Sequence, residues 1–483
     1  MKGYKIINSI VIITALAGMV AFSSCKKNGF YTNTDATLQF SSKLITFDTV
    51  FTSISTITKV LIVRNPYKND IKTDIALVGG ATSYFSINVD GIPARQLKDV
   101  EIPARDSIFI FIKANINPNG TNNPMLAVDT LSFTTNGNRQ NVELLAFGQD
   151  AHFIIPNRLL PIGIVKNDTI YLPYRIIAEE GQNVTWRNDK PYVIYGYAVV
   201  DSDAKLTIEK GTRIHFHKDG ALWIYTDGCL EVNGTKDEPV TFQGDRLDNW
   251  YDRDYNQWDG ICINESNRGS KINYAVIRNA DVGILAASSD KTKSSKLLIT
   301  NTIIKSCQTE ALWSRNYAID ASNNIFADCP QNCIFLQGGN YNFVNNTIYN
   351  AASSRQRKPS LSIRNYYDSN DVVVPADFSG TFINNIISGA AGNEFSFEKA
   401  NNANFSVSFE NCLLKQDSAL KSPVTQSNMI MNKDPLFENI ADFNFKLKSN
   451  SPCKKAGKSI SWLLTDIDGV SRNSSTPSIG AYE

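Results

Sequence analysis

Short apolar stretches recur through the second part of the chain without helical periodicity. The repeated unit is an asparagine, then any residue, then two apolar residues. Its copies begin at Asn301, Asn323, Asn346, Asn384 and Asn411, and Tyr274 begins an equivalent stretch. Successive copies start 27, 22, 23, 38 and 27 residues apart. Short apolar strands with this period predict a solenoid of stacked coils.

A parallel β-helix is the solenoid that this pattern favours. Stacking coils ~4.8 Å apart brings equivalent apolar residues into ladders, so we expect side chains such as Ile325 to point into the central stack. Asparagine at a corner tolerates a left-handed backbone and can bond to the asparagine one coil away. The 38-residue spacing requires a loop to leave the stack, and its polar pieces are residues 353–360 and 365–377.

The segment from about residue 37 to 150 has a different texture. Runs such as ITKVLIVRNPY, SIFIFIKANINPNG and DTLSFTTNG are short, β-rich and cut by Gly, Pro, Asn and Asp. Several short strands with regular turn signals predict an antiparallel β-sandwich.

The N-terminus predicts export from the cytoplasm. Lys2 and Lys5 precede an apolar run from Ile6 to Phe22, and the sequence AFSSC ends at Cys25. A charged start, a short apolar stretch and small residues at the cut are typical of a signal peptide. The run is shorter than the ~20 residues of a spanning helix, which argues against the alternative of an uncleaved anchor.

Small residues ending on Cys25 resemble the lipobox of bacterial lipoproteins. That resemblance implies acylation of Cys25, a membrane partner reached through the lipid, and residence in the cell envelope. Lys26 in place of an aspartate favours the outer membrane by the same resemblance, and the side that the protein faces stays open. An ordinary signal peptide is the alternative.

Two further resemblances concern the fold. VRNPY (63–67), IPARDSIFIFI (102–112) and VELLAFG (142–148) resemble the immunoglobulin-like modules of the ASPM/SPD-2/Hydin family. LTIEKGT, LEVNGT and PVTFQGD are similar to the opening coils of right-handed parallel β-helix proteins of the pectate-lyase-like superfamily. KDPLF, DFNFKL, NSPCKKAG, TDIDGVSR and PSIGAYE resemble the end of the choice-of-anchor Q proteins, although Cys453 and Lys454 depart from that pattern.

We therefore expect an all-β chain, in which an immunoglobulin-like β-sandwich precedes a right-handed parallel β-helix. The expected divisions are a signal peptide over 1–24, a lipidated cysteine and tether over 25–36, the sandwich over 37–152 and the β-helix over 153–483.

Composition excludes several classes of function. The 48 basic and 47 acidic residues nearly balance, so nucleic acid is not an expected partner. The chain has only 3 histidines, and its 8 cysteines are scattered, so we predict no metal site and no cofactor. Three minor alternatives remain: a metal held by His215 and His217, a Cys329–Cys333 disulfide, and calcium.

Catalytic residues are not identifiable. The N-T-D, D-D and G-H-G motifs of polygalacturonase-like proteins and the W-I-D-H and R-x-P-x-x-R runs of pectate lyases do not occur in the chain. Because fold alone does not define function, this absence only makes an enzyme the less favoured interpretation.

The strongest candidate site is GDRLDNWYDRDYNQWDG (244–260). Aromatic faces stack on sugars, while Asp and Arg bond hydroxyls and carboxylates. The candidate ligand residues here are Asp245, Arg246, Asp248, Trp250, Tyr251, Asp252, Arg253, Asp254, Tyr255 and Trp258. Calcium could use the same carboxylates. The alternative is that the tryptophans cap the core and the charges pair with one another.

Arg355 and Arg357 in the inserted loop form a second, basic candidate site, with a solvated loop as the alternative.

The favoured function is an envelope lipoprotein whose β-helix binds glycans or surface partners, such as a polysaccharide or an envelope protein, without catalysis. The alternatives are a polysaccharide lyase or glycoside hydrolase acting on an acidic polysaccharide, and a structural scaffold of an envelope assembly.

Overall fold

The chain divides into two compact units, Met1–Asp150 and Ala151–Glu483. The computed structural model describes residues 29–51, 58–116, 125–165, 168–246, 253–290, 293–352, 357–369 and 372–483. Cys25 and the predicted signal peptide lie outside these ranges. Within them, the elements are strands and the short 3-10 helices η1 (Gly80–Thr82) and η3 (Ile440–Asp442), which confirms the all-β fold class.

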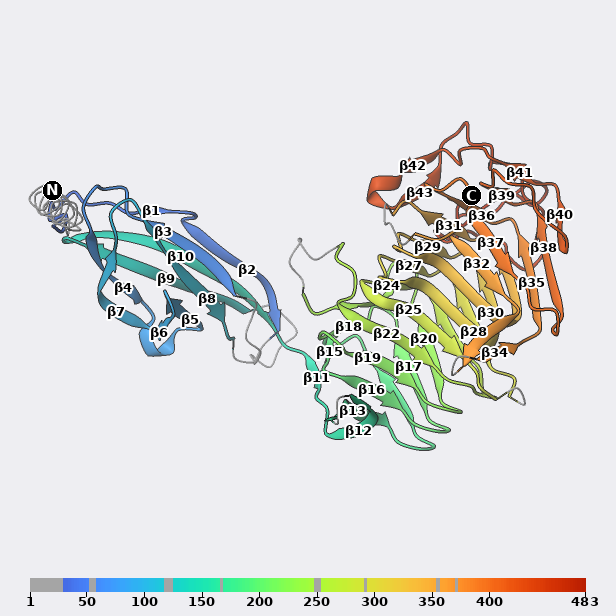
Figure 1. Cartoon of the computed structure of the whole chain (residues 1–483), viewed down its shortest axis with the longest axis horizontal. Helices are drawn as coiled ribbons and strands as arrows, with labels where there is room; N and C mark the ends of the chain where they lie inside the picture. The colour runs from blue at the N-terminus through green and yellow to red at the C-terminus, as the bar shows by residue number, and fades with distance from the viewer. Residues whose placement is uncertain are drawn as a thin grey trace, which may run out of the picture. The chain divides into compact units, whose positions relative to one another are not determined.

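The first unit is a β-sandwich of two five-stranded sheets (Figure 1). In spatial order, one sheet contains β1 (Gln39–Phe40), β3 (Lys59–Arg64), β8 (Ser107–Ala114), β5 (Phe85–Val89) and β6 (Ile92–Ala94). The other contains β2 (Leu44–Phe51), β10 (Asn138–Gln149), β9 (Met125–Thr135), β4 (Ile71–Leu77) and β7 (Gln96–Ile102). Their facing side chains, among them Phe47, Phe85 and Phe133, form one buried core. The immunoglobulin-like assignment stays a prediction.

The second unit is a parallel β-helix with three faces. Face A is an 11-stranded parallel sheet. Its strands are β11 (His152–Ile154), β15 (Tyr192–Ile194), β18 (Arg213–Phe216), β21 (Val240–Gly244), β24 (Ala275–Arg278), β27 (Ile303–Lys305), β29 (Ile325–Ala327), β31 (Thr347–Asn350), β36 (Ile386–Gly389), β39 (Leu413–Leu414) and β41 (Ile430–Met431).

Faces B and C belong to one 18-stranded sheet. Face B contains β16 (Tyr197–Val200), β19 (Ala221–Ile224), β22 (Trp258–Ile263), β25 (Ala280–Ala287), the first halves of β28 (Glu310–Ser322) and β30 (Asn332–Val344), β32 (Leu361–Arg364) and β37 (Phe395–Glu398). Face C contains β14 (Asn183–Trp186), β17 (Lys205–Glu209), β20 (Cys229–Asn233), β23 (Ser270–Asn273), β26 (Lys296–Thr300), the second halves of β28 and β30, β35 (Phe378–Ile383), β38 (Phe405–Glu410) and β40 (Val424–Ser427).

Two long strands join faces B and C. β28 and β30 each turn the corner between the faces at a residue with positive φ, which is Asn316 (53°) in β28 and Gly338 (61°) in β30. Figure 1 shows the strands of these coils stacked side by side along the second unit. At the N-terminal end of the stack, β13 (Asp168–Ala178) pairs with β16 and with the antiparallel β12 (Arg158–Val165).

In-register stacking builds the core of the β-helix. Phe343, Phe382 and Phe409 are register partners on consecutive coils, and their ring centroids are 5.3 and 5.0 Å apart. All three are buried. A strand of a few residues buries little surface alone, so each coil depends on its neighbours for its hydrophobic stabilisation.

Asparagines mark one corner of five successive coils, as predicted, but with one correction to the register. The residues with positive φ are Tyr274, Asn301, Asn323, Asn345, Asn384 and Asn411. The sequence pattern assigned Asn346 to this corner, whereas Asn345 occupies it. The pattern fits only from Asn346, because Thr347 is polar in the frame that begins at Asn345. The pairing of Ile325 with Thr347 nevertheless aligns Asn345 with the corner residue Asn323.

The second asparagine of each pair forms an inner ladder. Asn346 Nδ2 donates to Asn385 Oδ1 at 3.0 Å, and Asn324 Nδ2 donates to Asn346 Oδ1 at 3.0 Å. The backbone N–H groups of Asn324 and Asn346 donate to the same oxygens, each at 2.9 Å. The side chains of Asn324, Asn346 and Asn385 are fully buried and out of reach of solvent. The ladder therefore supplies the hydrogen-bond partners that their amide groups need.

The C-terminal residues fold back over the outer side of face A. Ile325 and Ile386 of face A form a buried cluster with Phe437, Ile467 and Ile479 of this segment. The expectation that Ile325 points into the central stack is therefore wrong, since its neighbour Phe326 occupies the inner core. The sequence pattern shows only that Ile325 and Phe326 are both apolar. Ile325 lies on the outer side of face A and is buried because the C-terminal segment covers it.

The cysteines of the described residues carry free thiols, Cys329 and Cys333 included. Cys307, Cys329, Cys333 and Cys412 are buried, and they serve as small core residues. Within the described residues, no helix has the length and apolar character needed to cross a bilayer.

Candidate functional site

The predicted ligand loop is only partly described. Asp248, Trp250, Tyr251 and Asp252 lie outside the described residues, as does Arg355 of the second candidate site. Their roles stay predictions. The remaining candidates fall into four environments: the core, contacts with the C-terminal segment, internal contacts with acidic residues of the β-helix, and a polar corner beside β18.

Trp258 belongs to the core and not to a ligand surface. Its indole is fully buried and stacks on Phe216 with ring centroids 4.0 Å apart and planes 7° apart. The indole N–H donates to the carbonyl of Arg278 at 2.9 Å. Trp258 begins β22, in which alternate residues face inward. The prediction that Trp258 contacts a sugar is therefore corrected, because the residue packs in the core.

Arg253 contacts the C-terminal segment. Its Nη2 donates to the carbonyl of Ala441 at 2.7 Å and lies 3.8 Å from an Asp442 carboxylate oxygen. Its guanidinium lies over the Phe443 ring, 5.6 Å from the centroid. The carbonyl oxygen of Asp254 accepts a hydrogen bond from Asn279. These contacts attach Arg253 and Asp254 to the solenoid and its C-terminal segment.

Tyr255 and Arg357 also make internal contacts. The Tyr255 hydroxyl donates to Asp328 Oδ1 at 3.3 Å, and burial raises the pKa of this phenol. Arg357 Nη2 lies 2.7 Å from Glu394 Oε1, and the exposed fractions of the two side chains are 10% and 0%. Arg357 therefore forms a buried structural ion pair. The prediction that it binds a ligand is corrected, because its side chain has no free face for a polysaccharide.

Asp245 pairs with a histidine at the polar corner beside β18. Its Oδ2 lies 2.7 Å from Nδ1 of His217, and the hydrogen bond from Asp245 raises the pKa of His217. Tyr195 stacks on the imidazole with centroids 4.6 Å apart. Arg246, the next residue, is exposed. His217 is about half exposed, so this corner is open to solvent.

His215 does not pair with His217. It is buried, with 5% exposure, and desolvation lowers its pKa to about 4. His217 follows the end of β18 and turns to the surface. Among the described residues, no group of three or more His, Cys, Asp and Glu side chains is placed to hold a metal ion.

Carboxyl groups with raised pKa values line one edge of face B. Asp259 accepts a hydrogen bond from the Tyr197 hydroxyl at 2.5 Å, and its pKa is raised by desolvation. Desolvation also raises the pKa of Asp281 on the next coil. Glu310, at the start of β28, is buried, and desolvation raises its pKa to about 7. Such shifts are commoner at functional sites than elsewhere.

The outer side of face B carries an aromatic row that the sequence analysis missed. Consecutive register partners along this row are Trp223, Cys262, Leu285, Trp313, Phe335 and Ser362. The row side chains are partly exposed. Trp313 and Phe335 are stacked, with centroids 6.3 Å apart, and the Trp313 indole N–H donates to Gln337 Oε1 at 2.8 Å. This bond fixes the orientation of the ring.

A polar row of two arginines and a glutamine lies next to the aromatic row on face B. Arg315, Gln337 and Arg364 are register partners, each two residues beyond a member of the aromatic row. The Arg364 guanidinium lies 5.3 Å from the Phe335 centroid and pairs with Glu398 at 2.9 Å. Arg315 lies over the Tyr367 ring at 5.0 Å, and no carboxylate partner exists for it among the described residues.

The inserted residues border this surface. Tyr366 and Tyr367 lie in β33 (Tyr366–Ser369), which pairs with β34 (Val372–Pro375) in an antiparallel hairpin. The signal that could have revealed the surface is the spacing of Trp313-x-Arg315 and Phe335-x-Gln337, which are 22 residues apart. Face B therefore combines aromatic rings, hydrogen-bonding groups and an unneutralised cation.

Comparison with known proteins supports the fold of this unit. Residues 177–293 match the pectate-lyase-like β-helix domain family. These residues include the coils from β14 to β25. No curated protein matches the sequence. A solved family 123 glycoside hydrolase from Clostridium perfringens, studied for glycolipid glycan hydrolysis, matches with 7% identity and a TM-score of 0.17. The match covers 24% of this chain and 30% of that one, and a likeness this low carries no argument about fold or function.

Proposed function

We propose that the pectate-lyase-like β-helix binds an acidic polysaccharide along face B. The observation that carries this proposal is the row of Trp313 and Phe335 beside Arg315. Aromatic faces pack against the C–H faces of sugar rings, and a guanidinium can bind a carboxylate through two hydrogen bonds.

The dimensions of face B suit a chain of several sugars. Trp223 and Trp313 are three coils apart in one row, which corresponds to ~14 Å at ~4.8 Å per coil. Because its members are register partners on successive coils, the row runs along the stack, so a polymer can contact several coils at once. Binding energy would then be distributed over repeated contacts, and each contact would be modest.

A binding assay with two variants tests this proposal. Polygalacturonate, alginate and a neutral glucan are titrated by calorimetry into the purified protein and into Trp313→Ala and Arg315→Ala. We expect Trp313→Ala to weaken the binding of an acidic polymer about tenfold, equivalent to ~1.4 kcal/mol. Arg315→Ala should weaken it and reduce its salt dependence. Tyr171→Ala, at a residue with 52% exposure outside face B, is the matched control. Unchanged affinity in Trp313→Ala, with a native melting curve, would contradict the proposal.

Catalysis at the edge of face B is the second candidate function. The raised pKa values of Asp259, Asp281 and Glu310 favour it, because a protonated carboxyl group can act as a general acid. New chain ends formed from a polymer, and lost in Asp259→Asn, would support a lyase or hydrolase. Binding without new ends supports the non-catalytic role, and no response to any polymer supports a scaffold.

We also propose that Cys25 anchors the protein to the outer membrane. The support for this is the lipobox-like sequence ahead of Cys25. Acyl chains contribute ~0.8 kcal/mol per buried CH₂. Cys25→Ala should move the protein from the membrane to the soluble fraction after cell lysis, while Cys229→Ala should remain membrane-bound. Sedimentation of Cys25→Ala with membranes would exclude the anchor.

A further inference from the structure

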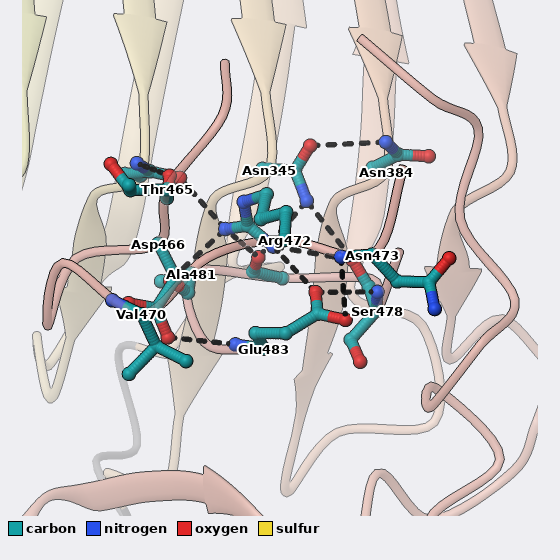
Figure 2. Close-up of polar contacts among 12 residues, drawn as sticks. Asn345, Asn384, Thr465, Asp466, Val470, Arg472, Asn473, Ser478, Ala481 and Glu483 are labelled. Carbon is teal, nitrogen blue, oxygen red and sulfur yellow. Dashed lines mark hydrogen bonds and ion pairs between the residues drawn. The ribbon is translucent and has the colours of Figure 1, made fainter. Parts of the chain in front are cut away.

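A loop of the C-terminal segment is fixed at both ends by corner asparagines of the solenoid. At its start, the Lys458 backbone N–H donates to Asn384 Oδ1 at 2.8 Å, and Asn384 Nδ2 donates back to the Lys458 carbonyl at 2.8 Å. At its end, Asn323 Nδ2 donates to the Thr465 carbonyl at 2.8 Å. Figure 2 shows Asn384 and Thr465 at the two sides of this bonded region. The loop therefore has a defined position on the solenoid.

Trp462 lies at the tip of this loop and overhangs face C. Its side chain is 60% exposed, which is unusual for the largest apolar side chain. With Leu298, Asp320 and Asn342 it lines a groove of about 480 Å³. Those three residues are register partners on consecutive coils, so the floor of the groove is a straight row of outward side chains.

The floor offers free hydrogen-bonding groups. Asp320 is exposed, and among the described residues it has no hydrogen bond or ion pair through its carboxylate. Asn342, on the next coil, is partly exposed. A carboxylate accepts several hydrogen bonds, and an amide both donates and accepts, so together they match neighbouring hydroxyl groups.

We propose that this groove is a second carbohydrate site, which binds a neutral pyranose unit of an oligosaccharide. Trp462 would cover the apolar face of the ring while Asp320 and Asn342 bond its hydroxyls. The negative charge of Asp320 disfavours uronic and other acidic sugars, in contrast to the cationic face B. The volume lies within the range of small-ligand sites. The site lies on a different face from Trp313 and does not depend on the function proposed for face B.

The experiment is a calorimetric titration of the purified full chain. The probes are neutral trisaccharides of glucose, mannose, galactose and xylose, with trigalacturonate as the acidic comparison. We expect at least one neutral trisaccharide to bind more tightly than trigalacturonate to the groove. Trp462→Ala should weaken that binding at least tenfold, and Asp320→Ala should weaken it severalfold.

Two matched variants distinguish binding in the groove from binding on face B or elsewhere on the C-terminal segment. Val470→Ala removes a side chain with 53% exposure from the same segment but not from the groove. Trp313→Ala is the variant that weakens binding at face B. Both should bind the neutral trisaccharide as the parent protein does. The proposal is overturned if none of the neutral trisaccharides binds, if Trp462→Ala binds normally, or if Trp313→Ala abolishes the binding. Because Trp462 is exposed, its loss should leave the melting curve unchanged.

Discussion

Arg472 Nη2 donates a hydrogen bond to Asn323 Oδ1 at 2.7 Å, although 149 residues separate them in the sequence. The same guanidinium donates to the carbonyls of Gly480 and Ala481 and lies 3.6 Å from Glu483 Oε2. Figure 2 shows Arg472 between the corner asparagines and Glu483. Only 4% of the Arg472 side chain is exposed, and burial lowers its pKa to about 10. The C-terminal segment is thus joined to the asparagine corner by a buried cation.

Replacing this cation should loosen the C-terminal segment. Arg472→Ala removes the ion-pair partner of the Glu483 carboxylate and the donor to the Asn323 oxygen. Breaking a buried ion pair costs ~3–5 kcal/mol. We expect a lower unfolding midpoint in denaturant and faster proteolysis within residues 433–483. Lys448→Ala, at an exposed position of the same segment, is the control and should change neither measurement. Equal protease resistance in Arg472→Ala would show that the apolar cluster alone holds the segment.

The inner asparagine ladder should be sensitive to a single truncation. Asn346→Ala removes the acceptor of the Asn324 backbone and side-chain N–H groups and the donor to Asn385. Each buried polar group left without a partner costs about 1–3 kcal/mol, so the free energy of unfolding should fall by at least ~2 kcal/mol. Chemical denaturation measures this change. Asn340→Ala changes an exposed asparagine of β30 and should have little effect. A similar loss in both variants would argue against the special role of the ladder.

The pKa values of His215 and His217 should be shifted in opposite directions from the usual histidine value of 6.5. Asp245 raises the pKa of His217, so the folded state binds that proton more tightly than the unfolded state. Its stabilising effect is present below 6.5 and is lost as the pH rises through the folded pKa. Burial lowers the pKa of His215 to about 4. Its contribution is present above 6.5 and is lost as the pH falls from 6.5 towards 4, by on the order of 3 kcal/mol.

An NMR titration checks both signs, because the chain has only 3 histidines. We expect one midpoint above 6.5 that falls in Asp245→Asn, and one near 4 that disappears in His215→Gln. His215→Gln should also reduce the loss of stability between pH 7 and pH 5. If the midpoints that these variants assign to His215 and His217 lay on the same side of the usual histidine pKa, they would contradict the packing of this corner.

The sequence by itself determined the fold class and the period of the coils. Asparagine and short apolar pairs recur because every coil needs one left-handed corner and inward side chains, and these are local requirements. The same local pattern placed the corner at Asn346 instead of Asn345 and pointed Ile325 instead of Phe326 into the core. In the 244–260 loop it could not show that Trp258 is buried while Asp245 meets His217.

Only the tertiary structure decided where a ligand surface can form. Trp313 and Arg315 come from β28, Phe335 from β30, and Trp462 from a loop of the distant C-terminal segment. Side chains on different coils become neighbours only when the register of the parallel pairing is known, and a shift of one residue would turn each of them to the opposite face. The physical reason is that strand pairing is non-local. The 22-residue spacing of Trp313 and Phe335 is visible in the sequence, but only the pairing shows that they are register partners and that Trp462 lies beside face C.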